Sequence, residues 1–377
     1  MSLRPRVVIV GTSNSVMRAG YTVPLKAEFG AANYSIGSSN NCVFALRADF
    51  VARHPGAVMV TDFVVNDNLS YAVGTLNEDI VYSHFVSMLG TCSKLNIVPI
   101  VHIMPHSWAR ARNGVIRDRY LALAHKFNLP FFDGFAYVET LYRLYPELNA
   151  FGWTEGAHIQ PPLARVIGRS LARGIRLVAA SPRRRRRGGD SWSVRRIQLS
   201  NFSGESVIKR ANSLISLSFA KMAPGSSFAV PGWPDGEIVG LATNMSHSNA
   251  VAEVVGETRG AFRTRTVYFG DGAPLRVAAW HFSKPIATRD KSVTLTCLSP
   301  ETDPGEPICD AARRAPAPED VSLELECLFE RRPLPHQVHM GLEAPLDLVA
   351  ALSEDDIRED RFAEPIEINS TTTQQAP

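Results

Sequence analysis

The chain has 377 residues, of which 45% are hydrophobic and 20% charged, and its formal net charge is +3. This length favours two domains, and the composition is typical of globular protein with enough apolar residues for a core in each. So small a charge does not support nucleic-acid binding, and no apolar run approaches the roughly 18 residues that a membrane-spanning helix needs.

The N-terminal residues and the cysteines indicate the cellular compartment in which the protein is expected. A strand is predicted almost at once, without the apolar segment and cleavage site of a secretory signal. The five cysteines are few and lack CxxC spacing: Cys42, Cys92, Cys297, Cys309 and Cys327. We therefore expect reduced thiols in a cytoplasmic protein. The alternative is export by another route, with a bridge from Cys297 to Cys309 or to Cys327.

Residues 1–180 alternate short apolar runs with amphipathic segments. The predicted strands are 6–11, 31–36, 57–64, 97–103 and 129–133. The predicted helices are 15–29, 42–53, 77–95, 115–127, 135–145 and 162–178. Strands that alternate with helices indicate an α/β domain with a parallel sheet covered on both faces.

The segment 181–191 is predicted to be a linker. It holds Pro182, the arginine run Arg183–Arg187 and two glycines, without apolar periodicity. Such a run is more often a solvated connection than a grip on nucleic acid or on an anionic glycan.

Residues 192–345 have a different pattern. Short segments in which every second residue is apolar are separated by clusters of turn residues. The predicted strands are 193–199, 213–221, 237–242, 261–269, 274–282, 292–298 and 321–329. This pattern predicts an antiparallel β-sandwich or jelly roll. Residues 346–377 are acidic and then polar, which predicts a disordered tail.

Four segments of the first domain carry residues suited to acyl transfer on a serine. Such a site needs a hydroxyl, a base, a group that orients the base, and donors for the oxyanion. Ser13, in Gly11-Thr12-Ser13-Asn14-Ser15, follows the first strand at the edge where open α/β sheets bind ligands. Gly37 follows the second strand and lets the backbone approach a substrate.

The other two segments supply an amide and an imidazole. Asn66, in Phe63-Val64-Val65-Asn66-Asp67, is expected at the end of the third strand, where its amide can donate a hydrogen bond. Glu155 precedes His158 by three residues, so the carboxylate can share one turn with the ring and steady its tautomer.

In this order, the four segments resemble those of the SGNH (GDSL-type) hydrolases, a serine esterase superfamily named for its Ser, Gly, Asn and His. The resemblance covers residues 6–178 and implies a flavodoxin-like three-layer fold. It implies that Ser13 is the nucleophile, that His158 is the base and that Glu155 orients it. The oxyanion hole would comprise the Ser13 and Gly37 backbone N–H groups and the Asn66 side chain.

The chain departs from the family pattern at three positions. Thr12 stands where the family has Asp, Val64 replaces the glycine two residues before Asn66, and Glu155 replaces an Asp. Each proposed residue also has a structural interpretation. Ser13 could cap a helix, Gly37 could serve a turn, Asn66 could cap a loop, and His158 could be a surface or core histidine. Four suitable residue types at four successive places favour the catalytic interpretation.

Other candidate sites are weaker, and we expect neither a metal nor a cofactor. His102 and His106 have helical ligand spacing, but Pro105 and the preceding strand argue against a helix. His336 and His339 have no Cys or carboxylate set to complete a metal site. The tryptophans of the second domain could stack on sugar rings, although core packing is commoner: Trp192, Trp233 and Trp280.

The resemblance implies an ester hydrolase that removes small acyl groups, acetyl above all, from a small molecule or a carbohydrate. By analogy of fold, the β-rich domain would aid glycan recognition. Two alternatives remain: a glycan O-acetyltransferase that uses the same residues, and a non-catalytic glycan-binding protein with a degenerate domain. We expect a small-molecule or glycan ester as the partner, with no nucleic acid and no membrane span; the oligomeric state is unknown.

Overall fold

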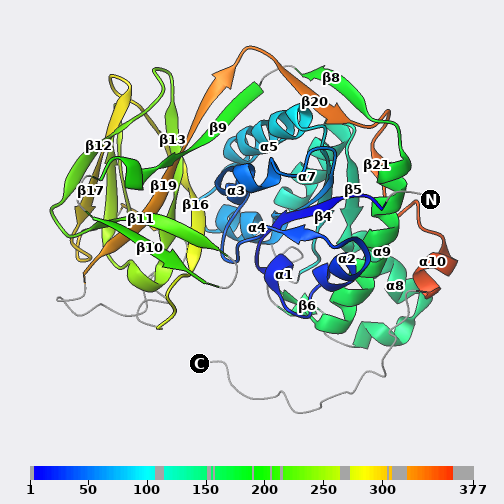
Figure 1. Cartoon of the computed structure of the whole chain (residues 1–377). Helices are drawn as coiled ribbons and strands as arrows, with labels where there is room; N and C mark the ends of the chain where they lie inside the picture. Colours follow the sequence, from blue (N-terminus) through cyan, green and yellow to red (C-terminus); the bar gives the residue numbers. More distant parts are fainter. Residues whose placement is uncertain are drawn as a thin grey trace.

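The computed structural model describes residues 4–106, 114–150, 154–155, 158–188, 191–203, 206–212, 215–263, 272–303, 305–307 and 321–359. Figure 1 shows two domains side by side, a parallel sheet with helices and a β-rich body. In the described part of the chain, no helix is long and apolar enough to span a membrane.

The first domain is built on a parallel sheet with strand order β2-β1-β3-β4-β5-β21. Its strands are β1 (Val7–Gly11), β2 (Ala32–Asn33), β3 (Val58–Asp62), β4 (Val98–Ile103), β5 (Pro130–Asp133) and β21 (Leu346–Asp347). The order 2-1-3-4-5 is that of flavodoxin-like folds, so the expected fold class is confirmed.

Helices cover both faces of this sheet. They are α1 (Ser13–Val16), α2 (Thr22–Phe29), α3 (Val43–Val51), α4 (Val64–Ala72), α5 (Glu78–Lys94), α7 (Val115–Lys126), α8 (Gly134–Leu144) and α9 (Pro161–Ala180), with the 3₁₀ turn η1 (Pro146–Ala150). Along β1, Val8 and Val10 face the core formed with α3, α5 and α7, whereas Val7 and Ile9 face α2, α8 and α9. This alternation follows from the two-residue period of a strand.

The second domain is a sandwich of two sheets, as expected. The first sheet holds β9 (Ser191–Gln198), β10 (Val207–Ala211), β11 (Ser216–Met222), β13 (Glu237–Asn244), β16 (Val277–Ala287) and β19 (Leu323–Leu334). The second holds β12 (Ser227–Pro231), β14 (Val251–Val255), β15 (Arg259–Arg263), β17 (Ser292–Leu298) and β18 (Gly305–Pro307). Trp280 is buried between the sheets, and Phe262 and Phe282 stack there at 3.6 Å.

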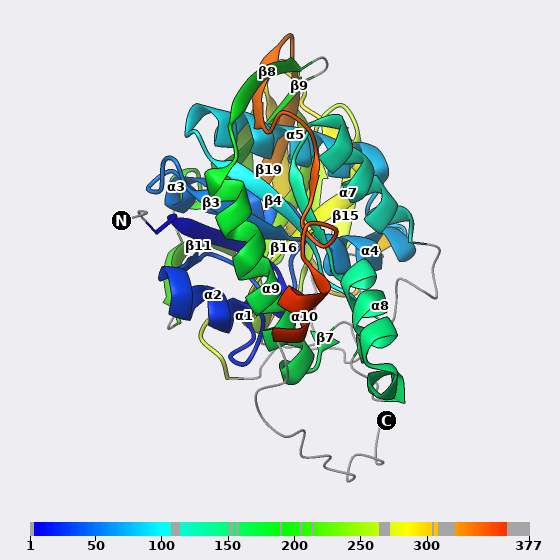
Figure 2. The ribbon, with the colours of Figure 1, turned by 90° about the vertical axis from the view of Figure 1, so that its right-hand side faces the viewer.

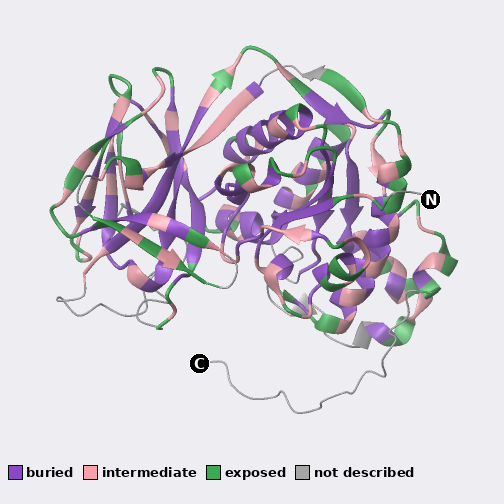
Figure 3. Ribbon diagram, viewed as in Figure 1, coloured by how far each residue is buried: buried purple, intermediate pink, exposed green. Residues whose placement is uncertain are grey.

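The first sheet of the sandwich packs against the first domain with its other face. Val239, Val277, Ala279 and Phe329 belong to the same apolar cluster as α3 and α5. Figure 3 shows this continuity, with buried residues running from the parallel sheet into β13, β16 and β19. The two domains therefore share one core.

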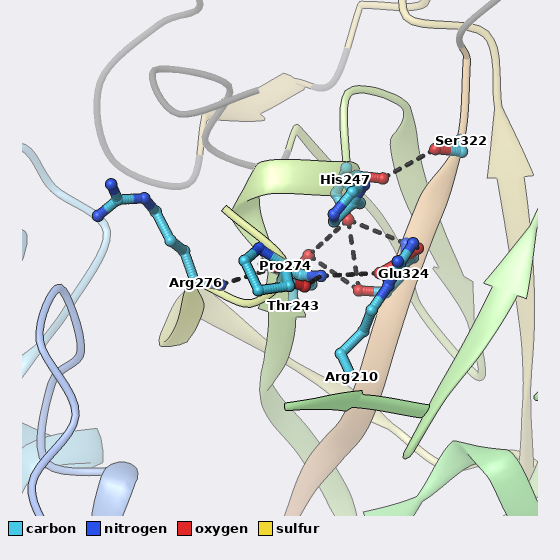
Figure 4. Close-up of polar contacts among 9 residues, drawn as sticks. Arg210, Thr243, His247, Pro274, Arg276, Ser322 and Glu324 are labelled. Atoms are coloured by element: carbon cyan, nitrogen blue, oxygen red, sulfur yellow. Dashed lines mark hydrogen bonds and ion pairs between the residues drawn. The ribbon is translucent and has the colours of Figure 1, made fainter. Parts of the chain in front are cut away.

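A buried polar cluster anchors the start of β16 within the second domain (Figure 4). The Glu324 carboxylate accepts hydrogen bonds from Arg210 at 2.6 Å and from the Asn244 amide at 2.8 Å. The Asn244 oxygen in turn accepts the backbone N–H of Arg276 at 3.0 Å. The short turn η3 (Met245–His247) is tied to β19 because Ser322 donates to the His247 carbonyl at 2.8 Å. These bonds fix the backbone directly before Val277.

The structure corrects the expected linker. Residues 184–188 form strand β8 (Arg184–Gly188), which pairs antiparallel with β20 (Gln337–Gly341) in a ribbon that lies over the first domain (Figure 1). Arg183 donates to the Gly56 and Asn96 carbonyls, and Arg184 pairs with Glu343 at 2.5 Å. Arg183 therefore joins the ribbon to the first domain, and Arg184 joins β8 to the segment that follows β20.

The expected disordered tail is also wrong for residues 346–359. Figure 2 shows the C-terminal segment running from the ribbon down along the first domain to α10 (Glu354–Glu359), next to α8 and α9. β21 extends the parallel sheet beyond β5, and Leu348 and Ile357 are buried in its core. Arg173 of α9 pairs with Asp356 at 3.0 Å. Residues 360–377 lie outside the described residues.

Four of the five cysteines are free and buried: Cys42, Cys92, Cys297 and Cys327. Their state agrees with the expected reduced thiols and contradicts a Cys297–Cys327 bridge. Cys309 lies outside the described residues.

Candidate active site

Ser13 and Ser15 lie in the short turn that follows β1, and they differ in accessibility. Ser13 is the first residue of α1, after the N-cap residue Thr12, and is partly exposed. Ser15 is fully buried and donates to the Asp62 carboxylate at 2.8 Å, while its oxygen accepts the Tyr21 hydroxyl at 2.7 Å. Only Ser13 is therefore open to a reaction partner.

The buried carboxyl beneath this turn was not anticipated. Asp62 ends β3, and burial raises its pKa to about 7, against the lowering effect of the Ser15 hydrogen bond. Gly11 is required in this arrangement, because a β-carbon there would overlap the Ser15 hydroxyl. Sequence reasoning missed Asp62 because it lies inside the predicted strand 57–64, which is mostly apolar.

Gly37 lies beside Ser13. A β-carbon built on Gly37 would be 3.9 Å from the Ser13 α-carbon and 3.6 Å from a methyl of Val16. The backbone before Gly37 is fixed, since the Ile36 N–H donates to the Gly11 carbonyl at 3.0 Å. The first two segments of the expected site thus come together at the end of β1.

Asn66 lies under the loop that follows Gly37. It is buried, and its Nδ2 donates to the Ser39 carbonyl at 2.7 Å. An amide nitrogen carries two donors, so one remains beyond this bond. The structure corrects the local setting of Asn66, because β3 ends at Asp62 and Asn66 lies in the first turn of α4.

His158 lies in a two-residue strand, β7 (His158–Ile159), which pairs with β6 (Thr154–Glu155). Glu155 is therefore opposite His158 in an antiparallel pair. The α-carbons of β7 and α1 approach within 8 Å, so His158 comes from an element next to the Ser13 turn. His158 is exposed overall, yet desolvation by neighbouring atoms lowers the pKa of its ring.

A network of buried polar groups holds the residues after Gly37. The Asp67 carboxylate accepts the Asn41 backbone N–H at 3.0 Å and the Tyr120 hydroxyl at 2.6 Å. Burial raises the pKa of Asp67 to about 7. The adjacent pair Asn40-Asn41 was a signal for this network, because buried amides need several partners.

Several of the other candidates identified from the sequence are buried or packed against neighbouring side chains. His102 and His106 are buried, and burial lowers the pKa of His102 to about 3. No group of three or more potential metal ligands occurs among the described residues. Trp280 is in the core, and the guanidinium groups of Arg195 and Arg332 lie 4.1 and 4.4 Å from the Trp233 ring.

Comparison with known proteins gives similarities of fold at low sequence identity. No protein-family model and no curated protein matches the chain. A two-domain esterase active on acetylated mannans is 14% identical over 90% of this chain and 92% of its own, with a TM-score of 0.48. A GDSL-like lipase from Bacteroides thetaiotaomicron is 18% identical over 46% of this chain and 89% of its own, with a TM-score of 0.36. At such identities, a function for this chain has to be argued from its own residues.

Proposed function

We propose that this chain is a serine-dependent ester hydrolase that removes small acyl groups, acetyl above all, from carbohydrate esters. One observation carries the proposal: partly exposed Ser13 at the end of β1 lies beside the Gly37 backbone. Asn66 is bonded to the loop that continues from Gly37. These contacts support a site with a nucleophile and two kinds of oxyanion donor at the sheet edge where α/β folds bind ligands.

In the proposed reaction, His158 takes the proton from the Ser13 hydroxyl as its oxygen attacks the acyl carbonyl. The oxyanion is held by the backbone N–H groups of Ser13 and Gly37 and by the Asn66 amide. The N–H at the first position of a helix has no partner within that helix, which suits Ser13 to this role. His158 then protonates the departing alcohol, and water releases the acyl group from Ser13.

Glu155 is proposed to orient His158. The support is the register of β6 and β7, which sets these two residues directly opposite each other. Residues opposite each other in an antiparallel pair are close neighbours on one face of the sheet.

The test is labelling with a fluorophosphonate probe, together with acetate release from an aryl acetate. Wild type should be labelled and active, and Ser13→Ala should lose the label and at least about 10³-fold in kcat. Ser15→Ala is the matched control, and it should keep the label because Ser15 is buried against Asp62.

Each other outcome identifies a different alternative. A wild type without label and without turnover would contradict the hydrolase and favour a non-catalytic binding protein. Label retained in Ser13→Ala but lost in Ser15→Ala would contradict the choice of nucleophile. Acetyl transfer to added oligosaccharide in preference to water would favour an O-acetyltransferase, and acetylated polysaccharides compared with aryl acetates test the carbohydrate preference.

A further inference from the structure

β16 is the edge strand of the first sheet in the second domain, in the order β10-β11-β19-β13-β16. An edge strand presents unpaired backbone groups that need a cover. The loop after Gly37 supplies part of that cover. The Asn40 N–H donates to the Ala279 carbonyl at 3.1 Å, and the Ala279 N–H donates to the Ser39 hydroxyl at 3.0 Å.

Ser39 connects this edge to both proposed oxyanion donors outside the nucleophile turn. Its hydroxyl accepts from Ala279 and donates to the Gly37 carbonyl at 3.4 Å. Its carbonyl accepts from the Asn66 amide at 2.7 Å. The backbone that follows Gly37 is thus held in position by hydrogen bonds to β16, a strand of the other domain.

A second contact fixes the loop two residues further on. His281 of β16 is buried, and its Nε2 lies 2.6 Å from the Asn41 Oδ1. The Asn41 amide nitrogen faces the Val81 carbonyl at 3.4 Å, an atom that can only accept, so its oxygen faces His281. Burial lowers the pKa of His281 to about 3, so the ring is neutral and donates from Nε2.

His281 is itself held in place. Its partner strand β13 has a register shift between Ile238 and Gly240, and Gly240 pairs with His281. Bulges of this kind redirect side chains, and they are frequent beside active sites. The His84 ring of α5 packs edge-on against His281 at 4.3 Å. The polar cluster before Val277 fixes the start of the same strand.

We propose that β16 of the second domain positions the oxyanion hole of the first domain, with Ser39 and His281 as positioning residues. This inference rests on the proposed hydrolase function. It assigns the second domain a role in the chemical step that is separate from any binding of the substrate.

The experiment compares His281→Ala, His281→Gln and Ser39→Ala in the full chain. Ser87→Ala is the matched control, because the Ser87 hydroxyl accepts the Val194 N–H at 2.8 Å and so joins the two domains through β9 rather than through β16. Misplacing an oxyanion donor should lower kcat for an aryl acetate by about 10- to 100-fold in His281→Ala and Ser39→Ala, with KM changed less than about 3-fold. His281→Gln can donate from the same place and should recover most of kcat.

Hydrogen exchange over residues 37–41 gives a readout that needs no activity. Exchange of the Asn40 and Asn41 amides should be faster in His281→Ala than in wild type or Ser87→Ala. Equal exchange and equal kcat in His281→Ala and Ser87→Ala would overturn the proposal, as would a His281→Gln variant as impaired as His281→Ala. A wild type that neither labels nor turns over would refute the hydrolase function, and the exchange comparison would then decide the positioning role alone.

Discussion

Ser13 and Ser15 are two residues apart, and their environments give them different roles. Ser15 is buried and its hydroxyl donates a hydrogen bond to the Asp62 carboxyl, so this hydroxyl has a structural role. Ser13 is partly exposed at the edge of the sheet. The sequence offers both as hydroxyls after a glycine turn, and burial distinguishes them.

The titration of His158 predicts the pH dependence of the proposed reaction. A general base acts only when neutral, so activity falls as the pH drops through the pKa of His158. Desolvation lowers that pKa from its ordinary value of 6.5. We therefore expect the acid limb of the kcat/KM profile to have its midpoint below pH 6.5, measured with an aryl acetate from pH 4 to 9.

Asp62, beneath the nucleophile turn, also titrates in this range, because burial raises its pKa to about 7. The variant Asp62→Asn separates the two groups, because it removes one titration and leaves His158 in place. An acid limb that persists in Asp62→Asn supports the assignment to His158. A limb that disappears with Asp62 contradicts it.

At the scale of elements, the apolar strands were predictable to within a few residues. Predicted strands 97–103 and 129–133 correspond to Val98–Ile103 and Pro130–Asp133, because fully buried parallel strands are continuous apolar runs. The helix α4 was missed, since Val64-Val65 reads as more of the preceding strand. β21 was missed because a segment of two residues is too short to show an apolar/polar alternation. Only its pairing with β5 makes it a strand.

The contact between α2 and α9 predicts the effect of a change at Gly168. A β-carbon there would overlap the Tyr21 carbonyl, which belongs to the backbone and cannot move without the start of α2. Gly168→Ala gains about 1 kcal/mol of helix propensity, but overpacking costs about 1–3 kcal/mol. We expect a net loss of stability, seen as a lower denaturant midpoint.

The control for this change is Leu177→Ala, on the same helix but 42% exposed. A surface substitution of this kind should alter the free energy of unfolding by no more than about 0.5 kcal/mol. A Gly168→Ala variant as stable as wild type would contradict the close packing of α2 on α9.

At the scale of the molecule, the two domains are joined by a common core, by the β8–β20 ribbon and by the return of the chain to the parallel sheet. Arg331 of β19 also bonds Asp79 of α5 at 2.7 Å and the Ser83 hydroxyl at 3.1 Å. Separate domains on a linker would unfold independently. A shared core predicts a single cooperative transition.

Calorimetry of the full chain tests this prediction. We expect one peak, with the calorimetric enthalpy equal to the van't Hoff enthalpy. Arg331→Ala should lower the transition temperature of the whole molecule, because both domains lose a partner. Two resolved peaks in the wild type, or a shift confined to one of two peaks, would show that the domains unfold separately.

The sequence by itself determined the α/β class of the first domain, the β-sandwich of the second, and the residue types of the candidate site. These three features follow from local hydrophobic periodicity and from the residue types at strand ends, and both can be recognised in the sequence itself. Only the tertiary structure decided that Ser13 is open and Ser15 closed, and that β16 bonds the loop after Gly37. Burial and edge pairing depend on contacts between distant segments, such as that of His281 with Asn41, 240 residues away, and no local pattern carries them.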